Sequence, residues 1–180
     1  MRELGWGEII GEVGLGMLLE LGVFDGRSFN EICSLVQPRL VWGFDWFYGL
    51  PEPWTDQVGG GDPQGERQCD RGGVVPDVAD NGKLVIGRVE QTLVPWLHRN
   101  PGHVAFVHFD MDLYTPTRFA LEVLGPRFFS GTILCFDEIW GANRNINHEQ
   151  RAFWEWLQTT GFGMKIIGQR HPESWVIRLV

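Results

Sequence analysis

The chain has 180 residues, 43% of them hydrophobic, and a formal net charge of −8, which fits one globular domain over residues 1–180. Lys and Arg form no basic stripe, so we expect no nucleic-acid partner. An acidic start, short apolar runs and three scattered cysteines argue against a signal peptide, a membrane span and a disulfide framework, and we expect a soluble, cytoplasmic protein.

The first half of the chain predicts two strands separated by a helix, with the first strand almost at the start of the chain. Residues 17–24 and 40–44 are apolar runs typical of strands, and residues 28–36 have the apolar spacing of a helix. Residues 55–83 are rich in Gly, Asp, Pro and Arg and show no periodicity. We therefore predict a loop there, either disordered or a functional lid.

The second half continues the alternation of strands and helices. Strands are predicted at 84–86, 103–109 and 132–136, and helices at 89–97, 117–124 and 149–160, with Pro95 expected to kink or cap its helix. The final strands, 164–168 and 174–179, are too close in sequence for a helical crossover and should form an antiparallel hairpin. This order of elements is typical of an open, mostly parallel α/β sheet.

Chemically reactive side chains gather where the predicted strands end. In open α/β sheets, ligands bind outside the carboxyl ends of the strands, where the strand order reverses. A single acid at such a place is usually a helix cap, but capping does not easily explain the whole set. Its members are Asp25, Asp45, Gly87, Asp110, Asp112, Asp137 and Glu138.

The first predicted turn has features of a cofactor site. Within ELGVFDGRS, residues 20–28, Gly22 and Gly26 allow a close approach of the backbone, and the following helix offers unpaired N–H groups to an anion. About twenty residues later, Asp45 ends the second strand and can accept hydrogen bonds from both hydroxyls of a ribose. The spacing differs from the G-x-G-x-x-G of a dinucleotide site, so we predict an adenosine-type cofactor that ends in a small charged group.

Two later strands end in paired acids, in FDMDLY and FDEIWG. If these strands are neighbours about 4.8 Å apart, Asp110 and Asp137 lie side by side, with Glu138 next to them. Such carboxylates repel, so one must hold a proton or all must share a cation, and an all-oxygen site suits Mg²⁺. The alternative is structural: Asp112 caps the helix that begins near Thr115, and Glu138 points to solvent.

The chain resembles the class I S-adenosylmethionine-dependent methyltransferases, and within them the macrocin O-methyltransferase-like family. The resemblance covers nearly the whole chain and rests on LLELGVFDGRS, VWGFDWFYGLPEPW, LVIGRVEQTLVPWL, VHFDMDLYTPT and GTILCFDEIWG. It implies the Rossmann-like class I fold and S-adenosylmethionine as the cofactor. The candidate cofactor-binding residues are Glu20, Gly22, Phe24, Gly26, Arg27, Ser28, Asp45, Trp46, Phe47, Gly87 and Asp110.

The resemblance also implies a reaction. A divalent ion, Mg²⁺ or another hard cation, would be held by Asp110, Asp137 and Glu138, and Asp112 would be the general base on an acceptor hydroxyl. The expected substrate is a small molecule, a sugar or another secondary metabolite. His148 is a rival base, although it also fits a helix cap, and we expect His108 to be a hydrogen-bonded core histidine.

Several alternatives stay open from the sequence. Asp110-Met111-Asp112 also fits the D-x-D of a metal-dependent glycosyltransferase that uses a nucleotide sugar, and the chain could bind S-adenosylmethionine without catalysis. Trp46 and Phe47 could stack on adenine, line the acceptor pocket or pack in the core. The aromatic helix that carries Phe153, Trp154 and Trp156 fits either a homo-oligomer interface or a buried face.

Overall fold

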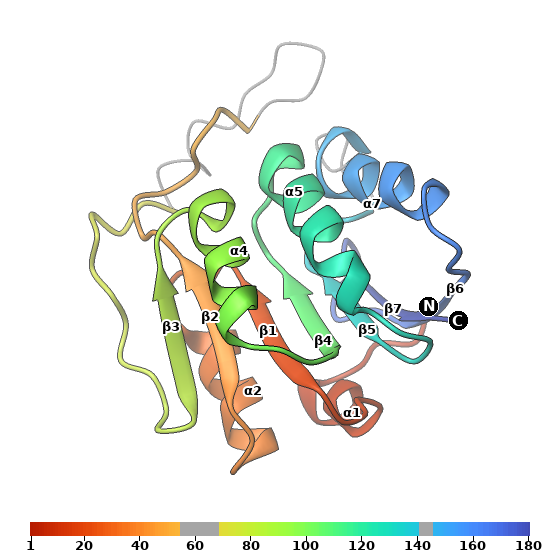
Figure 1. The fold of residues 1–180 in the computed structure, drawn as a ribbon, viewed down its shortest axis with the longest axis horizontal. Helices are drawn as coiled ribbons and strands as arrows, with labels where there is room; N and C mark the ends of the chain where they lie inside the picture. The colour runs from red at the N-terminus through yellow and green to blue at the C-terminus, as the bar shows by residue number, and fades with distance from the viewer. Residues whose placement is uncertain (55–68, 141–145) are drawn as a thin grey trace.

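The computed structural model describes residues 1–54, 69–140 and 146–180. Within these residues, seven strands form one sheet in the order β3-β2-β1-β4-β5-β7-β6 (Figure 1). The first five strands of this order run parallel, and β7 is antiparallel to both of its neighbours, as the predicted open sheet with a terminal hairpin requires. The strands are β1 (Met17–Leu21), β2 (Val41–Asp45), β3 (Gly82–Ile86), β4 (Val104–Phe109), β5 (Ile133–Phe136), β6 (Met164–Gly168) and β7 (Trp175–Leu179).

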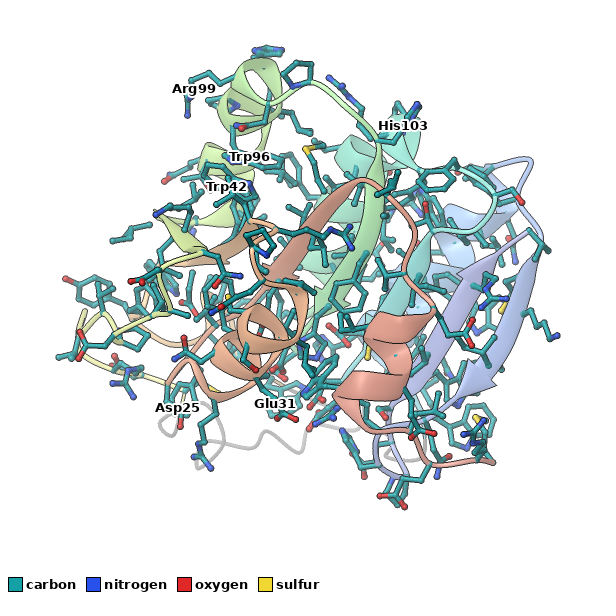
Figure 2. The ribbon with its side chains drawn as sticks, turned by 90° about the horizontal axis from the view of Figure 1, so that it is seen from below. Asp25, Glu31, Trp42, Trp96, Arg99 and His103 are labelled. Carbon is teal, nitrogen blue, oxygen red and sulfur yellow. The ribbon has the colours of Figure 1, made fainter. Side chains whose placement is uncertain are left out.

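Helices cover both faces of the sheet. On one face lie α4 (Val89–Arg99), α5 (Tyr114–Leu124) and α7 (Glu149–Gln158), and on the other lie α1 (Trp6–Gly11) and α2 (Arg27–Val36) (Figure 1). A short 3-10 helix, η1 (Gly125–Arg127), follows α5. Figure 2 looks along the sheet from below and separates the two layers, with Trp96 of α4 on one side and Glu31 of α2 on the other.

The alternation of side chains along each strand fills both layers. In β1, Leu19 and Leu21 pack in the core beneath α4, α5 and α7, whereas Leu18 packs with α1 and α2. Every residue of β4 is buried, as expected for a central parallel strand with both faces covered. The aromatic side of α7 belongs to the first core, because Phe153 and Trp156 are buried there. The buried-face alternative for this helix is therefore confirmed.

The strand order reverses between β1 and β4, and this reversal places the predicted acids together. Leu21 pairs with Phe109, and Phe109 pairs with Phe136. The pairing extends one residue further, because the N–H of Asp110 donates to the carbonyl of Leu21 and that of Asp137 to the carbonyl of Phe109, each at 2.9 Å. The prediction that the fourth and fifth strands are neighbours is confirmed.

Some element boundaries differ from the predictions. The sequence pattern missed α1, because its six residues include two glycines, yet α1 buries Trp6 and Ile9. Helix α4 continues through Pro95, so this proline neither caps nor ends it. Strand β3 begins two residues before residue 84. Residues 55–68 of the predicted loop or lid lie outside the described residues.

No helix among the described residues has the length and apolar character needed to cross a membrane.

Candidate active site

Glycine shapes the turn between β1 and α2. Gly22 has a φ of +89°, and a Cβ atom there would lie 1.8 Å from the carbonyl oxygen of Asp110, so no larger residue fits. Gly26 has a φ of +80° and occupies the N-cap position of α2. The turn therefore brings the backbone after β1 directly against the backbone after β4.

Asp45 holds this turn in place. Its Oδ2 accepts hydrogen bonds from the N–H groups of Val23 and Phe24, each at 2.8 Å, and its Oδ1 accepts one from the N–H of Phe47 at 2.7 Å. The predicted ribose-binding acid is thus also a clamp across the carboxyl ends of β1 and β2. Each carboxylate oxygen can accept two hydrogen bonds, so the clamp leaves capacity for a ribose hydroxyl.

A cavity of about 270 Å³ lies at the carboxyl ends of β1 to β4. Of the predicted cofactor residues, six line it: Gly22, Phe24, Asp45, Trp46, Gly87 and Asp110. Arg88, which the sequence pattern did not single out, also lines the cavity, with its guanidinium carbon 4.8 Å from the centre of the Trp46 ring. The cavity therefore combines an aromatic and glycine wall with the acids that follow β2 and β4.

The other predicted cofactor residues do not line this cavity. They are Glu20, Gly26, Arg27, Ser28 and Phe47. Glu20 is fully buried and accepts a hydrogen bond from the Ser28 hydroxyl at 2.6 Å, while Arg27 pairs with Asp25 at the surface. Phe47 is 1% exposed and belongs to the core beneath α1 and α2, so the core-packing alternative holds for this residue.

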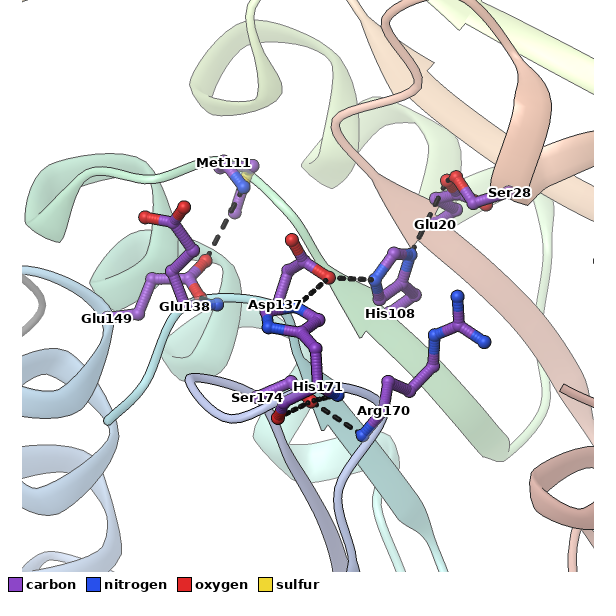
Figure 3. A network of polar contacts seen from close by, with 10 residues as sticks. All are labelled: Glu20, Ser28, His108, Met111, Asp137, Glu138, Glu149, Arg170, His171 and Ser174. Atoms are coloured by element: carbon purple, nitrogen blue, oxygen red, sulfur yellow. Dashed lines mark hydrogen bonds and ion pairs between the residues drawn. The ribbon is translucent and has the colours of Figure 1, made fainter. Parts of the chain in front are cut away.

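Three of the four paired acids line the cavity, and the fourth contacts histidines outside the lining. Asp110, Asp112 and Glu138 line the cavity. Asp137 instead contacts two histidines: its Oδ1 lies 3.1 Å from Nε2 of His171 and 3.8 Å from Nε2 of His108 (Figure 3). Asp137 therefore has imidazole partners in the protein itself.

His108 is central to this arrangement. It is 1% exposed, and its Nδ1 lies 3.4 Å from Oε1 of Glu20, so the imidazole stands between two carboxylates (Figure 3). Burial alone lowers the pKa of His108, but the carboxylates of Asp137 and Glu20 outweigh it and raise the pKa well above its usual value. Burial likewise works against the charged form of Asp137, yet the two imidazoles hold its pKa below the usual range. His108 lies in the core as predicted, but the predicted hydrogen bonds are not formed: its ring nitrogens lie only within ion-pair distance of Glu20 and Asp137.

For Asp110, the nearby His108 does not outweigh the effects that disfavour its charged form. Burial and the nearby carboxylate of Asp137 raise the pKa of Asp110 well above its usual value. In the part of the chain that the structure describes, three possible metal-ligand atoms come within 4.8 Å of one another only in Glu20, His108 and Asp110. The predicted set of Asp110, Asp137 and Glu138 is not assembled at that spacing, so the magnesium site stays a prediction.

Asp112 has an unusual backbone. Its φ is +63°, and the N–H of Leu113 donates to the carbonyl of Met111 at 2.7 Å, which makes Asp112 the central residue of a rare γ-turn. Leu113, not Asp112, is the N-cap of α5, so the capping alternative for Asp112 is wrong. A strained residue on a cavity wall is typical of a functional site.

His148 has a structural role. It occupies the N-cap position of α7 but makes no side-chain cap; instead its Nδ1 accepts a hydrogen bond from the N–H of Tyr114, at the start of α5, at 3.2 Å. It is 8% exposed and is not among the residues that line the cavity. Its catalytic role stays a prediction that this geometry does not favour.

Glu149 is a site residue that the sequence pattern missed. It is fully buried, and it accepts long hydrogen bonds from the N–H groups of Met111 and Glu138, each at 3.4 Å. One carboxyl group thus links the loop after β4 to the loop after β5. Burial, followed by the charges of Asp112 and the other acids, raises its pKa well above the usual value. An acid in the first turn of a helix is usually exposed, so the position of Glu149 in the sequence does not indicate a buried site residue.

The raised pKa of Glu149 predicts a pH-dependent stability. Folded protein keeps this proton at pH values where unfolded protein has lost it, so the stabilisation present below about pH 4.3 falls as the pH rises through the folded pKa. One proton contributes a slope of at most about 1.4 kcal/mol per pH unit. Urea unfolding of Glu149→Gln between pH 5 and 8.5 should therefore show a shallower decline than the native chain.

The control for this experiment is Glu155→Gln on the same helix. The Tyr114 hydroxyl and Arg151 lower the pKa of Glu155, so its contribution is constant across this pH window. Parallel curves for Glu149→Gln and the native chain would contradict the prediction.

We predict that the thiol of Cys69, at the cavity wall, reacts slowly with alkylating reagents. Its Sγ lies 3.9 Å from Oδ2 of Asp112, and burial together with that charge raises its pKa to about 12. Cys33 and Cys135 are buried, so Cys69 is the most accessible thiol. At pH 8 its alkylation by iodoacetamide, followed by mass spectrometry, should be at least about tenfold slower than in urea-unfolded protein. Equal rates would contradict the raised pKa.

Comparisons with known proteins agree with this geometry. No protein-family model and no curated protein matches the chain. The structure is similar to that of CalS11, a calicheamicin methyltransferase, with a TM-score of 0.74 and 26% identity over 96% of this chain and 76% of that one. It is also similar to the O-methyltransferase NovP (TM-score 0.59, 19% identity, 96% and 75% covered) and to a Bacillus cereus O-methyltransferase in complex with SAH (0.58, 12%, 96% and 76%).

At 19% and 12% identity, NovP and the Bacillus cereus enzyme are similar to this chain in fold alone. CalS11, at 26% identity, is similar in both sequence and fold. The glycosyltransferase alternative has no support from them. The reversed strand order, the glycine turn and these likenesses support the assignment of this chain as a class I S-adenosylmethionine-dependent O-methyltransferase.

Proposed function

We propose that the chain transfers the methyl group of S-adenosylmethionine to a hydroxyl of a sugar or another secondary metabolite, as a cytoplasmic enzyme of the macrocin O-methyltransferase-like group. The observation that supports this most is the cavity, which runs from the glycine turn and Asp45 to the carboxylates of Asp110, Asp112 and Glu138. CalS11 is described as a TDP-rhamnose 3'-O-methyltransferase, and a sugar hydroxyl is therefore the first acceptor to test.

The residues of the cavity have distinct parts in the proposed reaction. The turn at Gly22 and the acid Asp45 bind the cofactor, and Trp46 with Arg88 forms the wall beside it. The acceptor oxygen attacks the methyl carbon in line, the carbon–sulfur bond breaks, and the sulfonium becomes the neutral thioether of S-adenosylhomocysteine (SAH). Asp112 takes the proton of the hydroxyl as the new carbon–oxygen bond forms.

The chemistry of the acids beside the acceptor, rather than their spacing in this structure, suits a hard divalent ion. Burial and the carboxylate of Asp137 disfavour the charged form of Asp110, which a bound cation would favour, and the neighbouring carboxylates offer the oxygens that Mg²⁺ prefers. Asp110, Asp137 and Glu138 would hold the ion. When bound, it would lower the pKa of the acceptor hydroxyl.

Calorimetric titration tests this function. SAH is titrated into metal-stripped protein, Mg²⁺ is titrated into the complex, and methyl transfer to TDP-rhamnose is then assayed. We expect binding in both steps. Binding of SAH without a magnesium step would remove the ion from the mechanism but keep the methyltransferase. No binding of SAH would overturn the proposed function.

A further inference from the structure

The turn between β6 and β7 lies beside the acids that follow β5. Because β7 is antiparallel to β5, the start of β7 meets the end of β5, and Phe136 pairs with Trp175. Figure 3 shows the result: His171 and Ser174, which precede β7, stand next to Asp137. Residues about 35 positions apart in sequence are therefore neighbours at the site.

Two kinds of contact fix this turn to the loop after β5. The carbonyl oxygen of Glu173 accepts hydrogen bonds from the N–H groups of Ile139 and Trp140, each at 2.9 Å. The ring of Trp140 stacks on that of Trp175, with centroids 5.2 Å apart and planes 20° apart. The backbone of the turn and the backbone of the acid-bearing loop are therefore held together.

Ser174 makes the turn itself well defined. Its side chain is fully buried, and its Oγ accepts hydrogen bonds from the N–H groups of Arg170 at 2.6 Å and His171 at 2.9 Å. The same hydroxyl lies 3.1 Å from the carbonyl oxygen of His171, to which it donates. These contacts fix the backbone of His171, and hence the direction from which its ring reaches Asp137.

His171 and His108 approach the same oxygen of Asp137. Nε2 of His171 lies 3.1 Å from Oδ1, and Nε2 of His108 lies 3.8 Å from it (Figure 3). The hydrogen bond from His171 holds Oδ1 of Asp137, His108 lies near the same oxygen, and Oδ2 takes part in neither contact. A hydrogen bond of this kind to a ligating carboxylate orients it and typically changes metal affinity 10- to 100-fold.

We propose that His171 is a positioning residue that orients Asp137 to hold a divalent ion beside the acceptor. This inference rests on the proposed function, because that function places the ion there. It assigns the terminal hairpin a part in the site: the turn of the hairpin carries His171, which sets the direction of the metal ligand Asp137 directly after β5.

Three variants test the proposal. In His171→Leu the ring is replaced by an apolar side chain without a donor, whereas in His171→Gln an amide N–H remains available near the Nε2 position. His98→Leu, on the exposed side of α4, is the matched control for the loss of an imidazole. Each protein is metal-stripped and titrated with Mn²⁺, with and without saturating SAH, and free Mn²⁺ is measured by electron paramagnetic resonance. SAH affinity and Tm are measured in parallel.

We expect His171→Leu to bind Mn²⁺ 10- to 100-fold more weakly than the native chain, with SAH affinity unchanged and a cooperative thermal unfolding transition, and His171→Gln to recover most of the loss. His98→Leu should bind like the native chain. Native Mn²⁺ affinity in His171→Leu would overturn the proposal, as would a native chain that binds SAH but no Mn²⁺, and both results would leave methyl transfer standing. Loss of SAH binding in the native chain would instead overturn the proposed function.

Discussion

Asp112→Asn is expected to lower kcat of methyl transfer by roughly 10²- to 10⁴-fold, the usual contribution of a general base. Asn has nearly the same shape and tolerates the positive φ of this residue, so the γ-turn around position 112 should persist. The variant removes the group that accepts the hydroxyl proton and keeps the cavity. The affinity for SAH, measured by calorimetry, should therefore change by no more than about threefold, since the cofactor contacts remain.

The control for this variant is Asp80→Asn, which removes one carboxylate from an exposed loop position far from the cavity lining. Its kcat should match that of the native chain. Unchanged turnover in Asp112→Asn would remove the base from the mechanism, and an equal loss in both variants would indicate an effect of net charge.

Gly22→Ala is expected to lower the free energy of unfolding by about 3 kcal/mol or more and to abolish SAH binding. The new Cβ would lie 1.8 Å from the carbonyl oxygen of Asp110, so the backbone after β1 would have to separate from the backbone after β4. The φ of +89° adds strain for any residue with a side chain. Urea unfolding and SAH calorimetry measure the two effects.

Gly14→Ala is the matched control, because a Cβ there has no heavy atom within 4 Å. Its stability should stay within about 0.5 kcal/mol of the native chain. A Gly22→Ala protein with native stability would contradict the close approach of the two backbones.

The acids at the ends of β4 and β5 were predictable because both strands are buried apolar runs that end in acids. Parallel strands that are neighbours bring such ends together, and Leu21, Phe109 and Phe136 do lie in one row. The glycine turn and Asp45 were predictable for the same reason. The backbone contacts of Asp45 were not predictable, because two of its three N–H donors, Val23 and Phe24, belong to the turn after β1, whose approach only the folded chain determines.

The residues that the pattern missed share one property. Glu149 lies in the first turn of a helix and His171 lies in a surface turn, and both are ordinary at those positions in a sequence. Their importance comes from partners 11 to 38 positions away, at Met111, Glu138 and Asp137. No local periodicity carries such information.

By itself, the sequence determined the strand order along the chain, the helices other than α1, the glycine turn and the places where acids gather, because these follow from local apolar spacing and from glycine. Only the tertiary structure decided which groups balance those acids. The insertion of β7 between β5 and β6 brings His171 to Asp137, and the burial of β4 puts His108 between Glu20 and Asp137. The physical reason is that the cost of a buried charge depends on its neighbours in space, which the fold selects from distant parts of the chain.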